Sequence, residues 1–387
     1  MRCKRFNRIR KLQFHRSQDA KNVCDRPRLS FVHGRAVVAV FRWIPSSADA
    51  FPNQFTKMQQ YVVERDLAPA LYGKVLLCLD TVKGERVAVK RMEIAAASTH
   101  TTVDCKWRIP EDTAMEKHVN WALRRGGGHP HILGIRADFV DGDSECFVFD
   151  YCGGGELYDA LQHAPGHRFD LATARMFLGQ IARGVSFLHR QGVAHRDLSL
   201  ENVLLDATQT HAYICDFGLA VIGRTSSFLC IDGPVGKPFY IAPEVAAGRA
   251  YDSTKADVWS VGVMFYMMAT GRPLVQMAHH SDDRFRYLAS HGLCAFLDAL
   301  DTRQWFDDDA VSLLQLMLHV DPHERASVDQ VLRHPFLRHH TQLSTCRPRH
   351  NSSPGKAARL AKSIWLWIAP RLSSRRIRRR AREGVCA

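Results

Sequence analysis

Three side chains that carry oxygen atoms lie close together near the middle of the 387-residue chain. Asp197 precedes Asn202 by five residues, and Asp216 follows Asp197 after 19 residues. One carboxylate can accept the proton of an attacking hydroxyl group, while a carboxamide and a second carboxylate offer the hard oxygen ligands that Mg²⁺ takes. These residue types at this spacing predict phosphoryl transfer from ATP to a hydroxyl group.

The sequence around these residues resembles the eukaryotic protein kinases. Residues 195–202 (HRDLSLEN) match the family's catalytic loop, H-R-D-L-x-x-x-N, and residues 216–218 match its D-F-G motif. Residues 87–90 (VAVK), 242–244 (APE) and 257–262 (DVWSVG) resemble the V-A-I-K, A-P-E and D-x-W-S-x-G motifs. The resemblance covers residues 58–338. It implies an α+β, two-lobed protein-kinase fold, in which a small antiparallel β N-lobe with one main helix precedes a larger, mainly α C-lobe.

The resemblance also implies a role for each polar residue. Asp197 would orient the acceptor hydroxyl, and Lys90 would hold the α- and β-phosphates of ATP. Asn202 and Asp216 would hold Mg²⁺. Arg196 resembles the arginine of kinases that are activated when an upstream kinase phosphorylates the activation segment. The candidate acceptors in that segment are Thr225, Ser226 and Ser227.

Two glutamates compete as the helix residue that holds Lys90. Glu116 lies on one side of a helix predicted over residues 115–125, and it is our candidate. Asn120, one turn further on, stands where related kinases carry an apolar residue. Glu111 therefore remains a rival for the same role.

The other expected nucleotide contacts surround the adenine and the phosphates. Phe149 falls at the gatekeeper position, just before residues 150–152, whose backbone groups would hydrogen-bond adenine. Besides Lys90 and Glu116, the residues expected at the nucleotide are Ala68, Ala70, Gly73, Val75, Ala88, Phe149, Asp150, Cys152 and Leu204.

The glycine-rich loop departs from the family's pattern. The motif G-x-G-x-x-G falls on residues 68–73 (APALYG), so Ala68 and Ala70 replace two glycines and Pro69 lies between them. Glycine lets backbone N–H groups approach phosphates closely, and proline has no N–H group. We therefore expect a weaker grip on the phosphates of ATP.

The catalytic loop departs from the pattern as well. Ser199 replaces the lysine that serine/threonine kinases place two residues after the catalytic aspartate. Lys237 stands where these kinases carry a threonine that contacts the same aspartate. Because one cation is lost and another gained, we predict that Lys237 partly substitutes, and we count Ser199 and Lys237 with Asp197, Lys90 and Arg196 as catalytic candidates.

Two further glutamates have expected partners. Glu156 aligns with a residue that kinases with basic substrates use to hold a substrate arginine, so the resemblance implies a protein substrate with basic residues near the acceptor. Glu244 is expected to form a structural ion pair with Arg325, which follows Asp-Pro-His-Glu in the sequence.

The periodicity of apolar residues supplies the elements that must position these side chains. Short β-rich runs come first and helical periods follow, and residues 92–114 predict a loop insertion. The expected strands are 61–63, 73–79, 86–91, 135–140 and 146–149, and the expected helices are 115–125, 171–190, 254–269, 293–299, 309–318 and 328–333.

The net charge of +14 is concentrated at the two ends of the chain. Residues 1–56 carry 12 Lys and Arg against 3 Asp and Glu, residues 339–387 carry 12 against 1, and the middle is left at −6. We therefore predict a kinase domain over residues 58–338 between two basic, disordered extensions, 1–57 and 339–387. Nucleic acid or an anionic surface would bind only through these extensions.

Cysteine usage and hydropathy indicate the cellular compartment in which the protein resides. The 11 cysteines form no C-x-x-C pair, which argues against a disulfide framework and predicts a reducing compartment. No apolar run approaches the ~18 residues of a membrane-spanning helix. We expect a protein without a transmembrane segment, in the cytoplasm or the nucleus.

Three functions fit these patterns. The first is a serine/threonine protein kinase that resembles the calcium/calmodulin-dependent type, uses ATP and Mg²⁺, and is regulated through its activation segment. The second is a pseudokinase that acts as a nucleotide-binding or scaffold module, suggested by Ala68, Ala70 and Ser199. The third is a nucleic-acid-binding protein, suggested by the basic run of residues 375–382 (RRIRRRAR).

Overall fold

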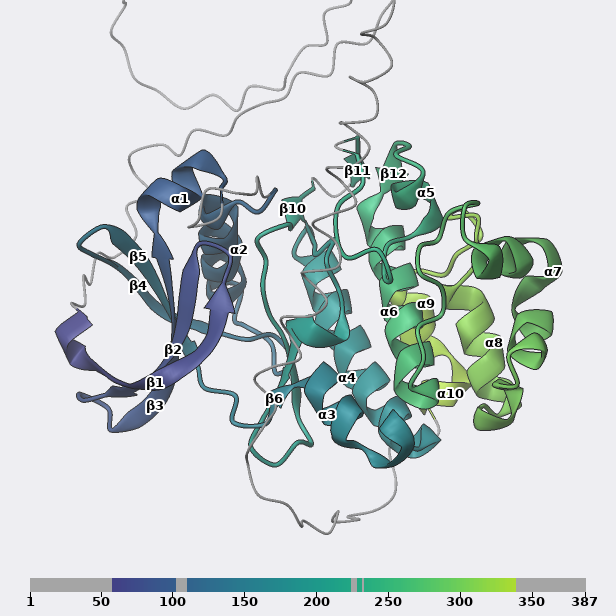
Figure 1. Cartoon of the computed structure of the whole chain (residues 1–387), viewed down its shortest axis with the longest axis horizontal. Helices are drawn as coiled ribbons and strands as arrows, with labels where there is room; N and C mark the ends of the chain where they lie inside the picture. The colour runs from purple at the N-terminus through teal and green to yellow at the C-terminus, as the bar shows by residue number, and fades with distance from the viewer. Residues whose placement is uncertain (1–57, 102–109, 224–227, 232, 339–387) are drawn as a thin grey trace, which may run out of the picture. The chain divides into compact units, whose positions relative to one another are not determined.

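The computed structural model describes residues 58–101, 110–223, 228–231 and 233–338, all within one unit that spans Gln54–Ala387. Its β-rich part comes first in the chain and its helical part second (Figure 1). The predicted α+β architecture with two lobes is therefore confirmed.

A five-stranded antiparallel sheet forms the N-lobe, with strand order β1-β2-β3-β5-β4. Asp80 shapes the β2–β3 turn, because its carboxylate accepts hydrogen bonds from the backbone N–H groups of Val82 and Lys83. A short 3-10 helix, η1 (Met58–Gln60), precedes the sheet. The strands are β1 (Tyr61–Ala70), β2 (Gly73–Asp80), β3 (Glu85–Glu93), β4 (Ile135–Asp141) and β5 (Ser144–Asp150).

One main helix, α2 (Thr113–Arg125), accompanies the sheet, as expected. Asp112 caps it by accepting hydrogen bonds from two backbone N–H groups of the first turn. The helix buries Val119 and Leu123, which join the hydrophobic core of the C-lobe. One face of α2 is thus fixed on the larger lobe, and this contact sets the position of Glu116.

The loop insertion predicted over residues 92–114 is partly wrong. Its described part contains a short helix, α1 (Ile94–Thr99), which directly follows β3. Buried Ala96 packs this helix on the sheet, and His100 ends it in the left-handed region at a φ of 52°. The sequence showed little periodicity here because a helix of this length presents only one buried residue.

The C-lobe is built on α4 (Leu171–Arg190) and α6 (Ser253–Thr270), which lie side by side (Figure 1). Apart from its capping end, α6 is buried almost along its whole length, and Trp259 is fully buried. The other helical segments are α3 (Leu157–His163), η2 (Pro165–His167), η3 (Leu200–Asn202), α5 (Pro243–Ala246), α7 (Asp283–Ala299), η4 (Arg303–Trp305), α8 (Asp308–Met317), α9 (Val328–Arg333) and α10 (Pro335–Arg338).

Three small antiparallel sheets hold the loops between the helices. The pairing of residues 193–194 with 221–222 brings the start of the catalytic loop beside the segment that follows Asp216. The strands of the three sheets are β6 (Gly155–Glu156), β8 (Val203–Leu205) and β9 (Ala212–Ile214) in the first, β7 (Val193–Ala194) and β10 (Val221–Ile222) in the second, and β11 (Leu229–Cys230) and β12 (Tyr251–Asp252) in the third. Among the described residues, no helix combines the length and apolar character needed to cross a membrane.

Candidate active site

A buried carboxylate of α6 anchors the backbone of the catalytic loop. Asp257 accepts a hydrogen bond from the backbone N–H of His195 at 2.9 Å and one from Arg196 at 2.8 Å. Arg196 has a φ of 67°, in the left-handed region that non-glycine residues rarely adopt. The strained turn is thereby held by two charge-assisted hydrogen bonds, and it presents the next residue, Asp197.

Asp197 and Asn202 face each other across this loop. The Asn202 amide donates to the Asp197 backbone carbonyl at 2.7 Å and to its carboxylate at 2.8 Å. The backbone N–H of Lys237 donates to the other carboxylate oxygen at 3.2 Å. Burial raises the pKa of Asp197, and the nearby Lys237 charge opposes that rise. The carboxylate is thus fixed in orientation, and its raised pKa makes it a better proton acceptor.

The Lys237 side chain ends beside the position of the missing lysine. Its Nζ donates to Ser199 Oγ at 2.7 Å and lies 3.4 Å from Asn202 Oδ1. Burial disfavours the charge, but Glu201 and then Asp197 outweigh it, so the pKa of Lys237 lies above its ordinary value. A fixed cation therefore lies against Ser199 of the catalytic loop.

Lys90 on β3 meets carboxylates of both lobes. Its Nζ lies 2.8 Å from each Glu116 oxygen on α2 and 3.6 Å from Asp216 Oδ1. Burial opposes the lysine's charge, yet Asp216 and Glu116 together raise its pKa above the ordinary value. Burial alone would raise the pKa of Asp216, but the charge of Lys90 outweighs it, so this pKa lies below its ordinary value. Lys90, Glu116 and Asp216 therefore form a charged network at the place where the lobes meet.

Glu111, the rival for the Lys90 pair, has a different place. Its side chain packs against Gly218, directly after Asp216 and Phe217, and the backbone N–H of Asp112 donates to the Gly218 carbonyl at 2.9 Å. Burial and the charge of Asp216 raise the pKa of Glu111 to about 8. Among the described contacts, the helix glutamate that ion-pairs with Lys90 is Glu116.

The segment expected to bind the phosphates forms β-strand over most of its length. Ala68 and Ala70 belong to β1 and pair with Val75 and Gly73 of β2, so that only residues 71–72 form the turn. A β-carbon on Gly73 would lie 2.1 Å from the Arg91 carbonyl oxygen, so only glycine fits there. The segment that aligns with the glycine-rich motif is therefore a narrow β-hairpin.

The tip of this hairpin is fixed by Tyr72. The ring is 2% exposed, and its hydroxyl donates to the backbone carbonyl of Glu111 at 2.7 Å. Burial and the Glu111 charge raise the pKa of Tyr72 to about 12. Local sequence pattern could not predict this contact, because the two residues are 39 positions apart.

The wall expected around adenine assembles from both lobes. Phe149 is buried, and Cys152 and Leu204 pack against the same hydrophobic cluster. Ala88 pairs with Phe149 across the sheet, and Val75 pairs with Lys90 on the neighbouring strand. Phe149, Cys152 and Leu204 thus share one hydrophobic cluster, and Ala88 and Val75 lie on the neighbouring strands β3 and β2.

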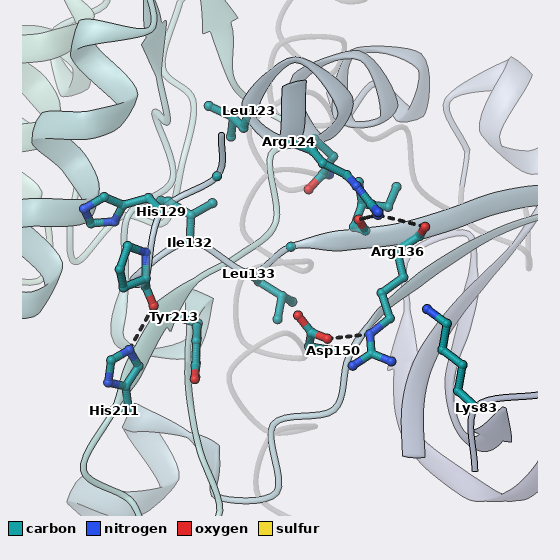
Figure 2. Close-up of a pocket in the computed structure, with 15 residues that line it drawn as sticks. Lys83, Leu123, Arg124, His129, Ile132, Leu133, Arg136, Asp150, His211 and Tyr213 are labelled. Carbon is teal, nitrogen blue, oxygen red and sulfur yellow. Dashed lines mark hydrogen bonds and ion pairs between the residues drawn. The ribbon is translucent and has the colours of Figure 1, made fainter. Parts of the chain in front are cut away.

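The Asp150 side chain, at the end of β5, lines a cavity of about 540 Å³ (Figure 2). Its carboxylate binds Arg136 at 2.5 Å, and Arg136 also binds Glu85. His211 and Tyr213 line the opposite side of the cavity. The Asp150 carboxylate is therefore engaged by Arg136.

Glu156 lies on the C-lobe side of the cleft, at the N-cap of α3. Burial and the charges of Asp159 and Glu201 raise its pKa to about 7. Glu156 and Glu201 thus lie near Lys237, whose Nζ approaches Glu201 Oε2 at 3.5 Å. The arrangement favours a cation as a further neighbour.

The remaining sequence-based candidates have mixed outcomes. Glu244 and Arg325 form the predicted ion pair, with Nη1 to Oε1 at 2.7 Å. Thr225, Ser226 and Ser227 lie outside the described residues. Sequence reasoning assigned no role to Asp257, although it belongs to a recognised motif.

The oxygen donors at Asp216 and Asn202 suit Mg²⁺. Asn202 uses its amide N–H₂ group on Asp197, which leaves its carbonyl oxygen facing the Lys237 side. Within the described residues, no three His, Cys, Asp or Glu side chains converge as a metal site. A carboxylate, an amide oxygen and the phosphates of a nucleotide together match the sites of this cation, which takes few protein ligands.

Comparison with known proteins agrees with this geometry. A model of the protein kinase domain matches residues 61–337. The chain is 30% identical over 282 residues to maternal embryonic leucine zipper kinase of Xenopus laevis, covering 73% of this chain and 40% of that protein. It is 34% identical over 297 residues to ribosomal protein S6 kinase alpha-6 of Homo sapiens, covering 75% and 36%.

A plant relative, CBL-interacting protein kinase 22 of Oryza sativa subsp. japonica, is 30% identical over 290 residues, covering 72% of this chain and 61% of that protein. The chain spans about two fifths of the length of the first curated relatives it matches. The matched region contains every motif and contact described above. The chain belongs to the protein kinase family.

Proposed function

We propose that the chain is a protein serine/threonine kinase that transfers the γ-phosphate of ATP to a protein hydroxyl group, using Mg²⁺. The single observation that carries this proposal is the contact of Lys90 with both Glu116 and Asp216. It joins the phosphate-binding lysine of one lobe to the metal-binding carboxylate of the other. This network must be in place for a kinase to transfer phosphate.

Each residue then has a defined task. Lys90 would bind the α- and β-phosphates, and Asp216 and Asn202 would hold Mg²⁺, which would neutralise charge on the phosphates. Asp197 accepts the proton of the acceptor hydroxyl, and Asn202 keeps its carboxylate oriented. Lys237 supplies a positive charge beside the transferred phosphate. The nucleotide lies against Val75, Ala88, Phe149, Cys152 and Leu204.

The chemistry of the substrate follows from the carboxylates beside Lys237. Glu156 and Glu201 would bind a basic residue of a protein substrate near its acceptor hydroxyl. Phosphorylation at Thr225, Ser226 or Ser227 by an upstream kinase would provide regulation. The basic extensions would carry any contact with nucleic acid or an anionic surface.

We place the protein in the cytoplasm or the nucleus. The described cysteines are all free, including the buried Cys78 and Cys146, and this supports a reducing compartment. Burial raises the pKa of both thiols to about 11, so that neither is readily ionised.

A transfer assay tests the proposal. The purified chain is incubated with Mg-ATP and a mixed set of Ser, Thr and Tyr peptides, beside an Asp197→Asn variant that keeps the shape of the loop. We expect transfer to Ser and Thr, reduced roughly 10²- to 10⁴-fold by Asp197→Asn, as for loss of a general base. Transfer by the parent at only the variant's rate contradicts the proposal, and retained nucleotide binding would then favour the pseudokinase.

A further inference from the structure

The activation segment is tied to the start of α6 by the chain's own backbone. In strands β11 and β12, Leu229 pairs with Asp252 and Cys230 with Tyr251. The Phe228 carbonyl accepts hydrogen bonds from the Ser253 backbone N–H and hydroxyl, both at 3.0 Å. The second half of the segment is therefore fixed next to the helix that also carries Asp257.

Tyr251 extends this anchor to the catalytic loop. Its hydroxyl accepts a hydrogen bond from Arg196 Nε at 3.0 Å, and the guanidinium lies 5.9 Å from the centre of its ring. The tyrosine is only 3% exposed. A hydrogen bond from a charged group in such a place is stronger than one at the surface, because water competes little for it.

Arg196 is consequently held by its backbone and by its side chain. Asp257 binds its backbone N–H at 2.8 Å, and Tyr251 binds its side chain. Between these two contacts the backbone adopts the left-handed φ of 67°. Because Asp197 is the next residue, any change in the Arg196 backbone changes the direction of the Asp197 carboxylate.

We infer that Tyr251 is a positioning residue for phosphoryl transfer: its hydroxyl holds Arg196, and through Arg196 it sets the direction of Asp197 and links it to the β11–β12 strand pair. This inference rests on the proposed function for its catalytic consequence. Tyr251 performs in the unmodified chain the part that the sequence resemblance assigned to a phosphate on the activation segment. The base is thereby aligned by contacts that the fold itself provides.

Tyr251→Phe separates this role from simple packing. Phenylalanine keeps the buried ring and the strand pairing, and it removes the hydroxyl group that accepts the hydrogen bond from Arg196 Nε. The matched control is Tyr266→Phe near the other end of α6, where a buried ring packs on Phe296 and Phe306. Both variants lose one buried hydroxyl group from the C-lobe.

The first measurement is steady-state transfer by the full chain. For Tyr251→Phe we expect kcat to fall about tenfold with little change in KM for ATP, as for the loss of one hydrogen bond to a charged group. Tyr266→Phe should stay within about twofold of the parent. In an Arg196→Ala background, Tyr251→Phe should have no further effect, because the partner is already gone.

Two outcomes would overturn the inference. One is an unchanged kcat in Tyr251→Phe. The other is an equal loss from Tyr251→Phe in the presence and absence of the Arg196 side chain, which would assign the effect to packing alone.

Hydrogen exchange provides a readout that does not need turnover. Mass spectrometry of Tyr251→Phe should show faster exchange than the parent in peptides that cover residues 193–203 and 228–231, and Tyr266→Phe should not. If the parent transfers no phosphate, the proposed function fails, and the exchange data still decide whether Tyr251 holds the catalytic loop. Unchanged exchange in these peptides would refute that hold.

Discussion

Lys237 brings a positive charge to the catalytic loop from 38 residues beyond Ser199. Lys237 Nζ donates a hydrogen bond to Ser199 Oγ at 2.7 Å. The backbone N–H of Lys237 donates another to the Asp197 carboxylate. A small side chain at position 199 leaves the space that the lysine enters. The cation and the residue that makes room for it therefore act as a pair.

We predict that Lys237→Ala lowers kcat for peptide phosphorylation by about 10- to 100-fold, because preorganised charge at the transferred phosphate is lost. The control is Lys83→Ala in the β2–β3 turn, which removes an exposed lysine and should leave kcat unchanged. Steady-state kinetics with saturating Mg-ATP provides the measurement. Full turnover in Lys237→Ala would show that the charge has no part in transfer.

A second substitution distinguishes charge from shape. Adding Ser199→Lys to Lys237→Ala returns a lysine to the position that the family pattern prescribes. This variant should recover most of the lost kcat. Failure to recover, with an unchanged unfolding midpoint, would mean that Lys237 acts through its other contacts, such as that with Glu201.

At the scale of single residues, the sequence predicted the parts that depend on motif spacing. It identified Lys90, Asp197, Asn202 and Asp216, which the structure brings together. It favoured Glu116 but could not exclude Glu111, because the choice depends on where α2 begins. Asp112 caps the helix directly after Glu111, so that only Glu116 lies within its first turn.

The β1–β2 hairpin shows how an element can change while its sequence motif stays recognisable. Strand β1 continues through two alanines and a proline to Ala70, so that the turn consists of residues 71–72. Pro69, which has no N–H group, lies in an edge strand, where its lack of a donor is tolerated. Tyr72 then anchors the tip at Glu111.

Gly73→Ala should destabilise the N-lobe. The added β-carbon would meet the Arg91 carbonyl at 2.1 Å, which forces β2 and β3 apart. We expect the free energy of unfolding to fall by about 1–3 kcal/mol, the usual cost of overpacking. The control is Gly134→Ala, whose β-carbon would lie 3.6 Å from Asp150 Oδ2, an ordinary contact. Urea unfolding measures both; equal midpoints for the two variants would disprove the close approach.

Helices were predicted well where one face is continuously apolar. The bounds of α4 and α9 agree with the predicted residues 171–190 and 328–333. Of α7, only residues 293–299 were predicted, because Gly292 interrupts the helical backbone with a φ of 78° and breaks the apolar period. Local pattern thus reveals long, regular elements, and long-range contacts determine the others.

At the scale of the whole domain, the Glu244–Arg325 pair connects segments that are 81 residues apart. Arg325 has no exposed side-chain surface, and Glu244 has 3%. The guanidinium also donates to the backbone carbonyls of His319 and Lys255. One buried arginine therefore joins α5, the start of α6 and the connection between α8 and α9.

We predict that breaking this pair destabilises the domain strongly. Arg325→Met leaves Glu244 buried without its cation, and Glu244→Gln leaves Arg325 without its anion. Each should lower the free energy of unfolding by about 3–5 kcal/mol, because an uncompensated buried charge is costly. The exposed pair Lys74–Asp66 is the control, since Lys74→Ala should cost less than about 1 kcal/mol.

The double variant Glu244→Gln/Arg325→Met shows whether the cost comes from charge or from position. It removes both charges and retains most of the volume, so it should be clearly more stable than the sum of the two single losses. Urea unfolding of all four proteins measures the coupling. Additive losses would mean that Arg325 stabilises the domain through the His319 and Lys255 carbonyls, with the Glu244 contact contributing little.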